Sequence, residues 1–263
     1  MGRRLQPHNV NNKVEIMSEI NNKMQISIVI PVFSETVTIT EITEELIKLI
    51  GDRILEIIII VSPKSQPETF TTCKNLENKY DFVHHYLQKV NPGVGRAYRD
   101  GFELAKGTHV LMIDGDGEMP VATAKLMVDK MDATECDMVI GSRWMAGGGA
   151  IGYDQTKYLL NRLFQYSFRV IIRTKIHDLT LGYKLMKAEI AHGLPWSGIH
   201  TNFAAETTMF PIKMGYKVDE VPTIWKKRST GVSKNNFRRN FLYVSTAFDV
   251  IKKSRRLRQS ANK

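Results

Sequence analysis

The chain has 263 residues, 43% hydrophobic and 24% charged, a composition typical of a globular protein whose core needs no disulfide bonds. No apolar run approaches the roughly 20 residues of a membrane span, and no apolar core follows Arg3 and Arg4, so a cytoplasmic location is expected. The net charge of +10 is concentrated in residues 226–263, which carry twelve lysines and arginines against one acid; the other 225 residues sum to about −1. The end of the chain, and not its body, is therefore expected to meet an anionic partner.

The first half of the chain alternates between short apolar runs and amphipathic segments. Residues 1–24 show no clear period, and we interpret them as a flexible extension. The runs predicted as strands are 26–30, 55–61, 82–87, 110–113 and 137–141, and the predicted helices between them are 36–50, 67–79, a helix that runs from the glycine turn at 91–95 to 105, and 120–131. This alternation favours an α/β protein with a mostly parallel, Rossmann-like sheet flanked by helices.

The pattern changes after the fifth predicted strand. Helices are predicted over 155–173 and 203–214, and an edge strand over 217–225, because Pro222 lies near its middle. The last predicted helix begins at residue 237, and its apolar stripe is Phe237, Phe241, Val244, Phe248 and Ile251. No clear linker divides the chain, so we expect one main domain over 25–235 and a basic amphipathic helix and tail over 236–263.

The fourth predicted strand ends in three carboxylates at alternate positions, Asp114, Asp116 and Glu118, separated by glycines. In an extended chain this alternation would project all three to one side, and oxygen ligands suit Mg²⁺ or Mn²⁺. The alternative is a solvated acidic turn, since Asp-Gly is a common turn dipeptide. Ligands of parallel α/β sheets bind beyond the carboxyl ends of the strands, where residues 33–35 and 62–65 are also predicted to lie. This convergence favours a metal site.

Two nucleotide-binding motifs can be set aside. The turn Gly93-Val-Gly95 lacks the third glycine of a dinucleotide fingerprint and follows the third strand instead of the first, and no P-loop is present. The sequence therefore favours neither a dinucleotide-dependent dehydrogenase nor a P-loop ATPase.

The order of the remaining motifs resembles the family 2 glycosyltransferases of the GT-A fold, and most closely the dolichyl-phosphate and polyprenyl-phosphate mannose synthases. The resemblance spans about residues 26–248, most of the chain. Its motifs are Pro31-Val-Phe-Ser-Glu35, Gly93-Val-Gly-Arg-Ala-Tyr98, Asp114-Gly-Asp116, Gly141-Ser-Arg143, Asp178-Leu-Thr-Leu-Gly-Tyr183, Glu220-Val-Pro222 and Arg228-Ser-Thr-Gly-Val-Ser-Lys234. The main domain is then expected to be a GT-A catalytic domain.

The resemblance implies a donor site for a nucleotide-sugar, either GDP-mannose or a UDP-hexose. Asp114, Asp116 and Glu118 match the motif that holds Mg²⁺ or Mn²⁺ on the donor diphosphate, where the ion neutralises charge on the leaving group. Asp116 and Arg228 are the residues expected to act in catalysis. The residues expected to contact the donor are Pro31, Phe33, Glu35, Ser62, Gly95, Arg96, Asp114, Gly115, Asp116, Arg228 and Lys234.

The resemblance also implies an acceptor that is a polyprenyl or dolichyl phosphate. Ser142, Arg143 and Arg162 match positions that hold the acceptor phosphate, and Asp178 and Thr180 match the loop beneath the sugar. A phosphate is already an anionic nucleophile, so inverting transfer would need positioning more than a general base.

A glycan hydroxyl is the alternative acceptor, as in the synthesis of surface polysaccharides. That reaction requires a carboxylate base, and Glu206 is the candidate. For Glu206 itself, a structural carboxylate paired with a basic residue is the competing interpretation.

Two departures from the family pattern leave questions open. Ser62 and Pro63 stand where the family usually has Asp after the second strand, which leaves the base of the donor undecided and admits a catalytically altered nucleotide-binding relative. Glu118 stands where related enzymes often have Gln, and its added charge should tighten metal binding.

The basic end fits a lipid acceptor. An amphipathic helix followed by Lys252, Lys253, Arg255, Arg256 and Arg258 is expected to lie on the cytoplasmic face of an anionic membrane, or to reach it through a membrane partner protein. The alternative is a helix packed on the domain with a solvated basic end. No DNA- or RNA-binding motif is present, so no nucleic-acid partner is expected.

Overall fold

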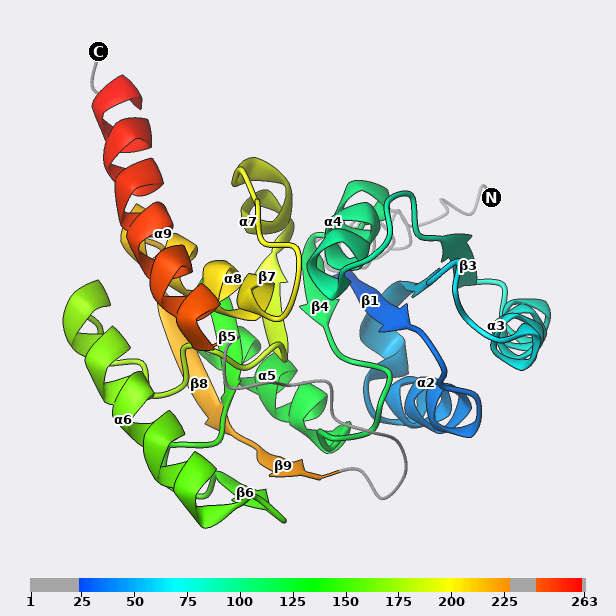
Figure 1. Cartoon of the computed structure of the whole chain (residues 1–263). Helices are drawn as coiled ribbons and strands as arrows, with labels where there is room; N and C mark the ends of the chain where they lie inside the picture. Colours follow the sequence, from blue (N-terminus) through cyan, green and yellow to red (C-terminus); the bar gives the residue numbers. More distant parts are fainter. Residues whose placement is uncertain (1–23, 228–239, 262–263) are drawn as a thin grey trace, which may run out of the picture.

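The computed structural model describes residues 24–227 and 240–261, which Figure 1 draws in colour. The predicted extension therefore lies outside the described residues except for Met24, as do residues 236–239 of the predicted tail. The strands are β1 (Ile26–Val32), β2 (Ile54–Val61), β3 (Val83–Leu87), β4 (His109–Met112), β5 (Met138–Ser142), β6 (Gly149–Ile151), β7 (Lys184–Lys187), β8 (Val218–Pro222) and β9 (Ile224–Lys226). The helices are α2 (Val37–Ile50), the short 3₁₀ helix η1 (Gly51–Arg53), α3 (Pro67–Lys79), α4 (Val94–Leu104), α5 (Ala122–Ala133), α6 (Gln155–Ile172), α7 (Ala188–Gly193), α8 (Asn202–Met214) and α9 (Asn240–Ala261).

Seven strands form one sheet in the order β3-β2-β1-β4-β7-β5-β8, and β6 and β9 form a separate two-stranded ribbon. All neighbours in the sheet are parallel except β7, which runs antiparallel to both β4 and β5. The predicted mostly parallel α/β sheet is confirmed, and the predicted strand over 217–225 does lie at an edge, where it divides into β8 and β9.

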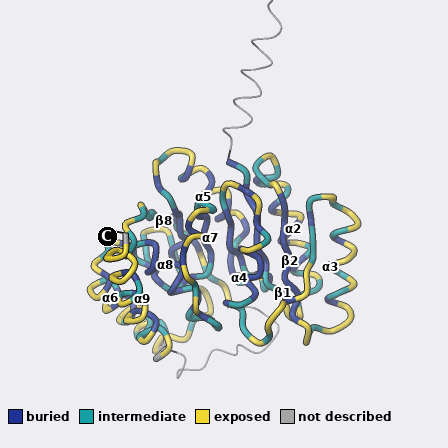
Figure 2. The backbone as a smooth tube through the Cα atoms, turned by 90° about the horizontal axis from the view of Figure 1, so that it is seen from above, coloured by how far each residue is buried: buried dark blue, intermediate teal, exposed yellow. Residues whose placement is uncertain are grey.

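Helices cover both faces of the sheet, and two apolar clusters fill the space between the layers (Figures 1 and 2). Because side chains alternate along a strand, Ile28 and Ile30 of β1 join the cluster beneath α2, α3 and α5, whereas Val29 joins the cluster beneath α4, α6, α7, α8 and α9. The strands in Figure 2 are buried, and the outer faces of the helices are exposed. The core therefore fixes which face of each strand packs against which layer of helices.

The strand β7 was missed in the sequence. It is four residues long, has lysine at both ends and contains no β-branched residue, so it lacks the usual strand pattern. In the structure it lies between β4 and β5, with Lys184 paired to Met112 on one side and to Ile140 on the other. Its tertiary surroundings, and not its own propensity, make it a strand.

The C-terminal helix α9 buries only part of the predicted apolar stripe, of which Phe237 lies outside the described residues. Val244 and Ile251 do pack against the core, but the Phe248 side chain is 60% exposed, while Ala247 and Val250 are fully buried. The helix also continues to Ala261 instead of ending near Lys253. The apolar stripe deduced from large side chains was therefore wrong in part, because small and branched residues face the domain.

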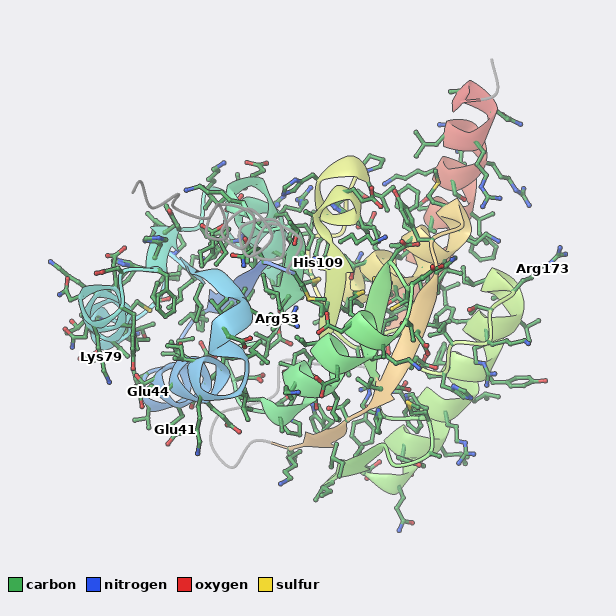
Figure 3. All side chains as sticks on the ribbon, turned by 180° about the vertical axis from the view of Figure 1, so that it is seen from behind. Glu41, Glu44, Arg53, Lys79, His109 and Arg173 are labelled. Carbon is green, nitrogen blue, oxygen red and sulfur yellow. The ribbon has the colours of Figure 1, made fainter. Side chains whose placement is uncertain are left out.

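Exposed ion pairs join neighbouring helices at the surface. Lys79 of α3 binds Glu44 of α2 at 2.6 Å, and Arg53 of η1 binds Asp132 of α5 at 2.6 Å (Figure 3). Exposed pairs of this kind contribute little, so the fold depends on the two apolar clusters. Across residues 24–227 and 240–261, no helix combines the length and the apolar character needed to cross a membrane.

Candidate active site

The loops that carry the predicted site residues meet at one edge of the sheet. Strands β1, β2, β4 and β5 end at this edge, and β7 begins there because it runs in the opposite direction. Neighbouring loops are joined directly: the N–H of Ser62, after β2, donates to the carbonyl of Val32, at the end of β1, at 2.9 Å. The expected convergence of loops at the carboxyl ends of the strands is present.

The chain turns after β4 instead of remaining extended. Gly117 has a φ of +70°, and the N–H of Glu118 donates to Asp116 Oδ1 at 3.1 Å. Asp114 Oδ1 accepts from the Tyr98 hydroxyl of α4 at 2.8 Å, whereas Glu118 Oε2 accepts from the Trp225 indole of β9 at 2.8 Å. The expectation that an extended chain points all three carboxylates to one side was wrong, because a turn directs Asp114 and Glu118 to different elements.

Asp114 lies in a strongly negative environment. Its pKa is raised from 3.8 to about 7, first by burial and then by the charges of Asp116, Glu118 and Glu35. Burial also raises the pKa of the Tyr98 phenol, so this hydroxyl remains a donor to Asp114. Such mutual repulsion among carboxylates is what a bound divalent cation would relieve.

The oxygen donors of this turn fit a Mg²⁺ or Mn²⁺ ion that completes its shell with phosphate oxygens and water. In the described part of the chain, no group of three or more His, Cys, Asp or Glu side chains is arranged so that it could hold a metal ion by itself. Mg²⁺ is usually held by one or two carboxylates together with substrate phosphates, so a full cage is not required. Asp114 and Asp116 would hold the ion, with Glu118 adding charge beside them.

The raised pKa of Asp114 predicts how pH affects the metal-free protein. A carboxyl group with a raised folded-state pKa binds its proton more tightly when folded, so its contribution to stability is lost as pH rises from about 4 to about 7. The measurement is the thermal unfolding midpoint in EDTA across this range, for the wild type and for Asp114→Asn, which is neutral throughout. The difference, wild type minus variant, should fall with pH; a constant or rising difference would contradict the raised pKa.

The loop after β1 is organised by Glu35. Its Oε2 accepts the backbone N–H groups of Phe33 at 2.6 Å and Ser34 at 2.8 Å, so the carboxylate caps its own loop. The Phe33 side chain is 42% exposed at the rim of the site. Pro31 approaches the acidic turn closely, since a Cβ on Gly115 would lie 3.2 Å from the carbonyl oxygen of Pro31.

Ser62, where the family usually has an acid, belongs to a neutral hydrogen-bond network. Its Oγ accepts from the N–H of Lys64 at 3.2 Å and from the amide of Asn91 at 2.8 Å. The same amide donates to Gln88 Oε1 at 3.0 Å, and Ser62 is only 5% exposed. This side of the site therefore presents amides and hydroxyls where an acid was expected.

The close approach of the loop at residues 198–199 to the start of α4 requires glycine at position 95. The N–H of Gly95 donates to the carbonyl of Ile199 at 2.9 Å, and a Cβ there would lie 2.5 Å from the carbonyl oxygen of Gly198. Arg96 is half-buried, and its Nη1 donates to the carbonyl of Pro92 at 3.2 Å. The contacts of both residues are therefore with the loops around them.

Arg143 and Asp178, assigned separately to acceptor and sugar, form one buried ion pair. Nε and Nη2 of Arg143 bind the two carboxylate oxygens at 2.7 and 3.0 Å, and Nη2 also donates to Thr180 Oγ1 at 3.1 Å. The Asp178 side chain is fully buried, and its own N–H donates to Glu220 Oε1 of β8 at 2.9 Å. Gln165 of α6 completes the network by donating to Thr180 Oγ1 at 2.6 Å.

The other predicted acceptor residues lie in different surroundings. Ser142 is fully buried, and its Oγ has no hydrogen-bond partner among the described residues. Arg162 is exposed on α6, directly after Asn161, whose amide donates to the Tyr153 hydroxyl at 3.0 Å. The structure thus brings α6 alongside the Arg143 network while Arg162 itself faces outward.

Lys184, at the start of β7, was not predicted to be a site residue. It is fully buried, and its ammonium donates to the carbonyl of Ala204 at 2.6 Å and to Thr207 Oγ1 at 2.7 Å. Burial lowers its pKa to about 7, opposed by the charges of Asp178 and Asp114. Lys184 is thus within electrostatic reach of both Asp178 and Asp114, and no local motif in the sequence indicates it.

Glu206 of α8 fixes a loop. Its oxygens accept the N–H of Ser197 at 3.0 and 3.1 Å, the Ser197 hydroxyl at 2.8 Å and the N–H of Gly198 at 2.7 Å. Lys253 of α9 lies 3.5 Å away, and Glu206 is 2% exposed. This arrangement favours the structural interpretation over a general base. Arg228 and Lys234, the predicted donor loop, lie outside the described residues.

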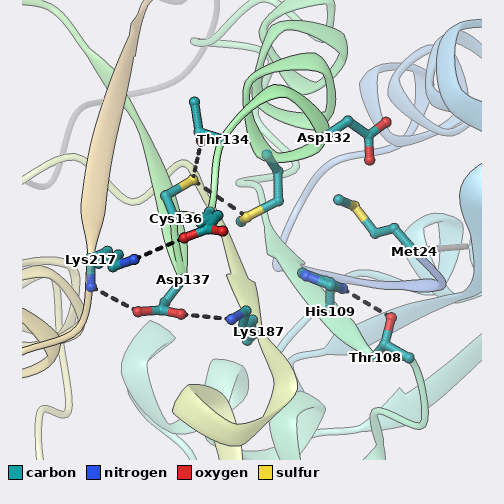
Figure 4. Close-up of a pocket in the computed structure, with 11 residues that line it drawn as sticks. Met24, Thr108, His109, Asp132, Thr134, Cys136, Asp137, Lys187 and Lys217 are labelled. Carbon is teal, nitrogen blue, oxygen red and sulfur yellow. Dashed lines mark hydrogen bonds and ion pairs between the residues drawn. The ribbon is translucent and has the colours of Figure 1, made fainter. Parts of the chain in front are cut away.

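A polar cavity of about 670 Å³ lies at the opposite edge of the sheet, where β4 and β5 begin (Figure 4). His109, Cys136 and Lys217 are among the residues that line it, and Asp137 pairs with Lys187 at 2.7 Å. Its lining contains none of the predicted site residues, so it is separate from the candidate site.

Comparison with known proteins identifies the family. Residues 27–194, more than half of the chain, match the family described as Glycosyl transferase family 2. The chain belongs to glycosyl transferase family 2. This family 2 chain is 31% identical to polyprenol monophosphomannose synthase of Mycolicibacterium smegmatis over 160 residues, which are 59% of the chain and 60% of that protein. It is 27% identical to undecaprenyl-phosphate mannosyltransferase of Micrococcus luteus over 159 residues, 58% of the chain and 64% of that protein.

The matches thus span less than two thirds of these curated relatives. Among solved structures, this family 2 chain is similar to glucosyl-3-phosphoglycerate synthase from Mycobacterium tuberculosis in complex with Mn²⁺, uridine-diphosphate and phosphoglyceric acid. The TM-score is 0.68 at 15% identity, covering 94% of the chain and 84% of that structure. At this identity the likeness concerns the fold, and the expected GT-A fold is confirmed.

Proposed function

We propose that the chain is a metal-dependent, inverting glycosyltransferase that moves a hexose from a nucleotide-sugar to a polyprenyl or dolichyl phosphate at a membrane surface. The observation that carries the proposal is the turn after β4, in which Asp114, Asp116 and Glu118 crowd three carboxylates at the edge of the sheet where the site loops meet. The mannosyl transfer to lipid named in two relatives supports the choice of acceptor.

On the donor side, a bound Mg²⁺ or Mn²⁺ would neutralise the charge that develops on the departing nucleoside diphosphate. Tyr98 holds Asp114 in place, and the Glu35-capped loop forms the neighbouring wall. We assign Arg228 and Lys234 to the donor site as well, where their positive charges would act on the diphosphate.

On the acceptor side, the phosphate is the nucleophile and needs positioning more than deprotonation. Arg143 offers a guanidinium that Asp178 already orients through two hydrogen bonds, so little entropy is lost when a phosphate oxygen approaches. The Ser142 hydroxyl, which has no hydrogen-bond partner among the described residues, lies next to it in the chain. Asp178 and Thr180 remain assigned to the sugar.

The alternative acceptor, a glycan hydroxyl, needs a free carboxylate base. Four hydrogen bonds engage the oxygens of Glu206, which disfavours that role. A catalytically altered nucleotide-binding relative is the second candidate, because Ser62 replaces the acid expected after β2.

The surface of α6 favours contact with a membrane. Leu159, Leu163, Tyr166 and Val170, at spacings of 4-3-4, form one stripe in which each side chain is more than 60% exposed. Arg162 and Arg169 flank the stripe, and Arg173 points away from the body of the protein at the end of the helix (Figure 3). Helix α9, the predicted membrane helix, contacts α6 and adds the exposed Phe248. An apolar stripe bordered by arginines is typical of a helix that lies in an anionic interface.

Charge on this stripe should prevent membrane binding. The double variant Leu163→Glu and Val170→Glu is expected to bind vesicles that contain anionic phospholipid at least about tenfold more weakly, because buried apolar area is lost and repulsion is gained. Cosedimentation measures the binding. Leu126→Glu, at a 44% exposed leucine of α5, is the matched control and should bind as the wild type does. Equal binding of all three proteins would refute the α6 surface.

The proposed function is tested by transfer of labelled sugar from GDP-mannose, UDP-glucose and UDP-galactose to polyprenyl phosphate in anionic vesicles. Product that partitions into organic solvent is expected with Mn²⁺ or Mg²⁺ and should disappear in EDTA. Transfer to a soluble glycan in place of the lipid would support the hydroxyl acceptor. Donor binding without transfer to any acceptor would support the catalytically altered relative.

A further inference from the structure

The indole of Trp225 meets the acidic turn from a distant part of the chain. Its Nε1–H donates to Glu118 Oε2 at 2.8 Å, and the backbone N–H of Lys226 donates to the carbonyl of Glu118 at 2.7 Å. Glu118 is therefore bonded to two successive residues of β9, through its side chain and through its main chain. Glu118 and Trp225 are 107 positions apart in the sequence, so only the folded chain makes this contact.

The indole is itself held on two sides. Tyr153 packs edge-on against its ring, with centroids 5.2 Å apart and an interplanar angle of 82°. The backbone of β9 pairs with β6 in the register Ala150 to Trp225, and the Trp225 side chain packs against the apolar core. An indole held in this way provides a fixed donor for the carboxylate.

Glu118 is where such a donor matters most. The N–H of Glu118 donates to Asp116 Oδ1 at 3.1 Å, so the residue that Trp225 binds is itself bonded to the neighbouring carboxylate of the turn. A flexible third carboxylate could turn away from this crowded turn toward solvent, whereas an N–H bond to one oxygen sets the direction of the whole group. Such outer partners of metal-site carboxylates tune the affinity for the ion.

We infer that Trp225 is a positioning residue of the metal-diphosphate site, and that its N–H fixes the Glu118 carboxylate beside the cation that Asp114 and Asp116 would hold. The inference rests on the proposed function, because it concerns the cation. It goes beyond that function by giving β9 a part in a site that the motif alone places on the loop after β4.

The test is Trp225→Phe, which keeps an aromatic ring and removes the N–H. The dissociation constant for Mn²⁺, measured by titration calorimetry on the nucleotide-free protein, should rise about tenfold. Trp144→Phe is the matched control, since the Trp144 indole has a buried Nε1 that makes no hydrogen bond within the described residues. Its ring belongs to the same aromatic group, 4.9 Å from Tyr158, and its Mn²⁺ affinity should equal that of the wild type.

The same substitution made in the Glu118→Ala variant separates an effect of Trp225 on the position of Glu118 from a general effect on the fold. In Glu118→Ala, adding Trp225→Phe should cause no further loss of Mn²⁺ affinity, because the partner of the indole is already gone. An equal loss in both backgrounds, or no loss in the wild-type background, would overturn the inference while leaving the proposed function intact. A wild-type protein that binds no Mn²⁺, either alone or together with GDP or UDP, would overturn both together.

Discussion

Replacing Asp116 with alanine should abolish the metal-dependent part of nucleoside diphosphate binding and lower the rate of sugar transfer by about 10²- to 10³-fold. Asp116 combines two features: its charge adds to that of Asp114, and its Oδ1 accepts the N–H of Glu118 within the turn. Asp116→Asn retains an oxygen that can accept this N–H but loses the charge. It should therefore preserve the turn and still lose the metal, which separates ligation from local structure.

The measurement is the affinity for GDP and UDP with Mn²⁺ and with EDTA, by calorimetry or by thermal shift. Asp129→Ala on α5 is the control, because this exposed carboxylate pairs across one helical turn with Lys125, away from the acidic turn. Its affinity should match that of the wild type. If Asp116→Ala retained the full Mn²⁺-dependent gain in affinity, the acidic turn would not be the metal site.

Replacing Asp178 with alanine should lower the free energy of unfolding by about 3–5 kcal/mol, the usual effect of removing one partner from a buried ion pair. The Arg143 side chain is only 10% exposed and would keep its charge without the carboxylate that binds it. The backbone N–H groups of Arg143 and Thr180 would also lose their bonds to this carboxylate. Urea unfolding monitored by circular dichroism provides the measurement.

Two further variants test whether the loss of stability in Asp178→Ala comes from the buried charge of Arg143. Asp132→Ala breaks the partly exposed pair with Arg53 and should cost less than about 1 kcal/mol. The double replacement Arg143→Met with Asp178→Leu removes both charges together and should recover most of the lost stability. If Asp178→Ala unfolded at the same urea concentration as the wild type, the pair would contribute nothing to the fold.

The fold could be predicted wherever local pattern and tertiary surroundings agree. Five strands and the helices between them follow from apolar runs and helical periods, and Pro222 correctly indicated an edge strand. The strand β7 is the exception, because Lys184 is buried by contacts with Ala204 and Thr207 that lie about 20 residues away. A sequence pattern would place such a lysine on the surface.

For the described part of the site, the positions of the loops after β1, β2, β4 and β5 could be predicted, but not the partners of their side chains. The place of Asp114 at the end of a buried strand follows from adjacent residues. The pairing of Arg143 with Asp178 and of Glu118 with Trp225 joins residues 35 and 107 positions apart. Such contacts depend on strand order, which a single sequence does not reveal, so Arg143 was assigned to the acceptor without its partner.

The central place of β7 has a consequence for how the chain folds. Strands β1 to β4 can associate among themselves, but β5 has only β7 and β8 as neighbours in the sheet, and both follow it in the chain. The second half of the sheet must therefore wait until residues 184–222 are available, and long-range pairing of this kind is slow because loops must close first. Asp114 and Arg143, on either side of β7, come to the same edge of the sheet only once β7 lies between β4 and β5. A nascent chain thus carries the acidic turn before it has assembled the pocket in which that turn would work.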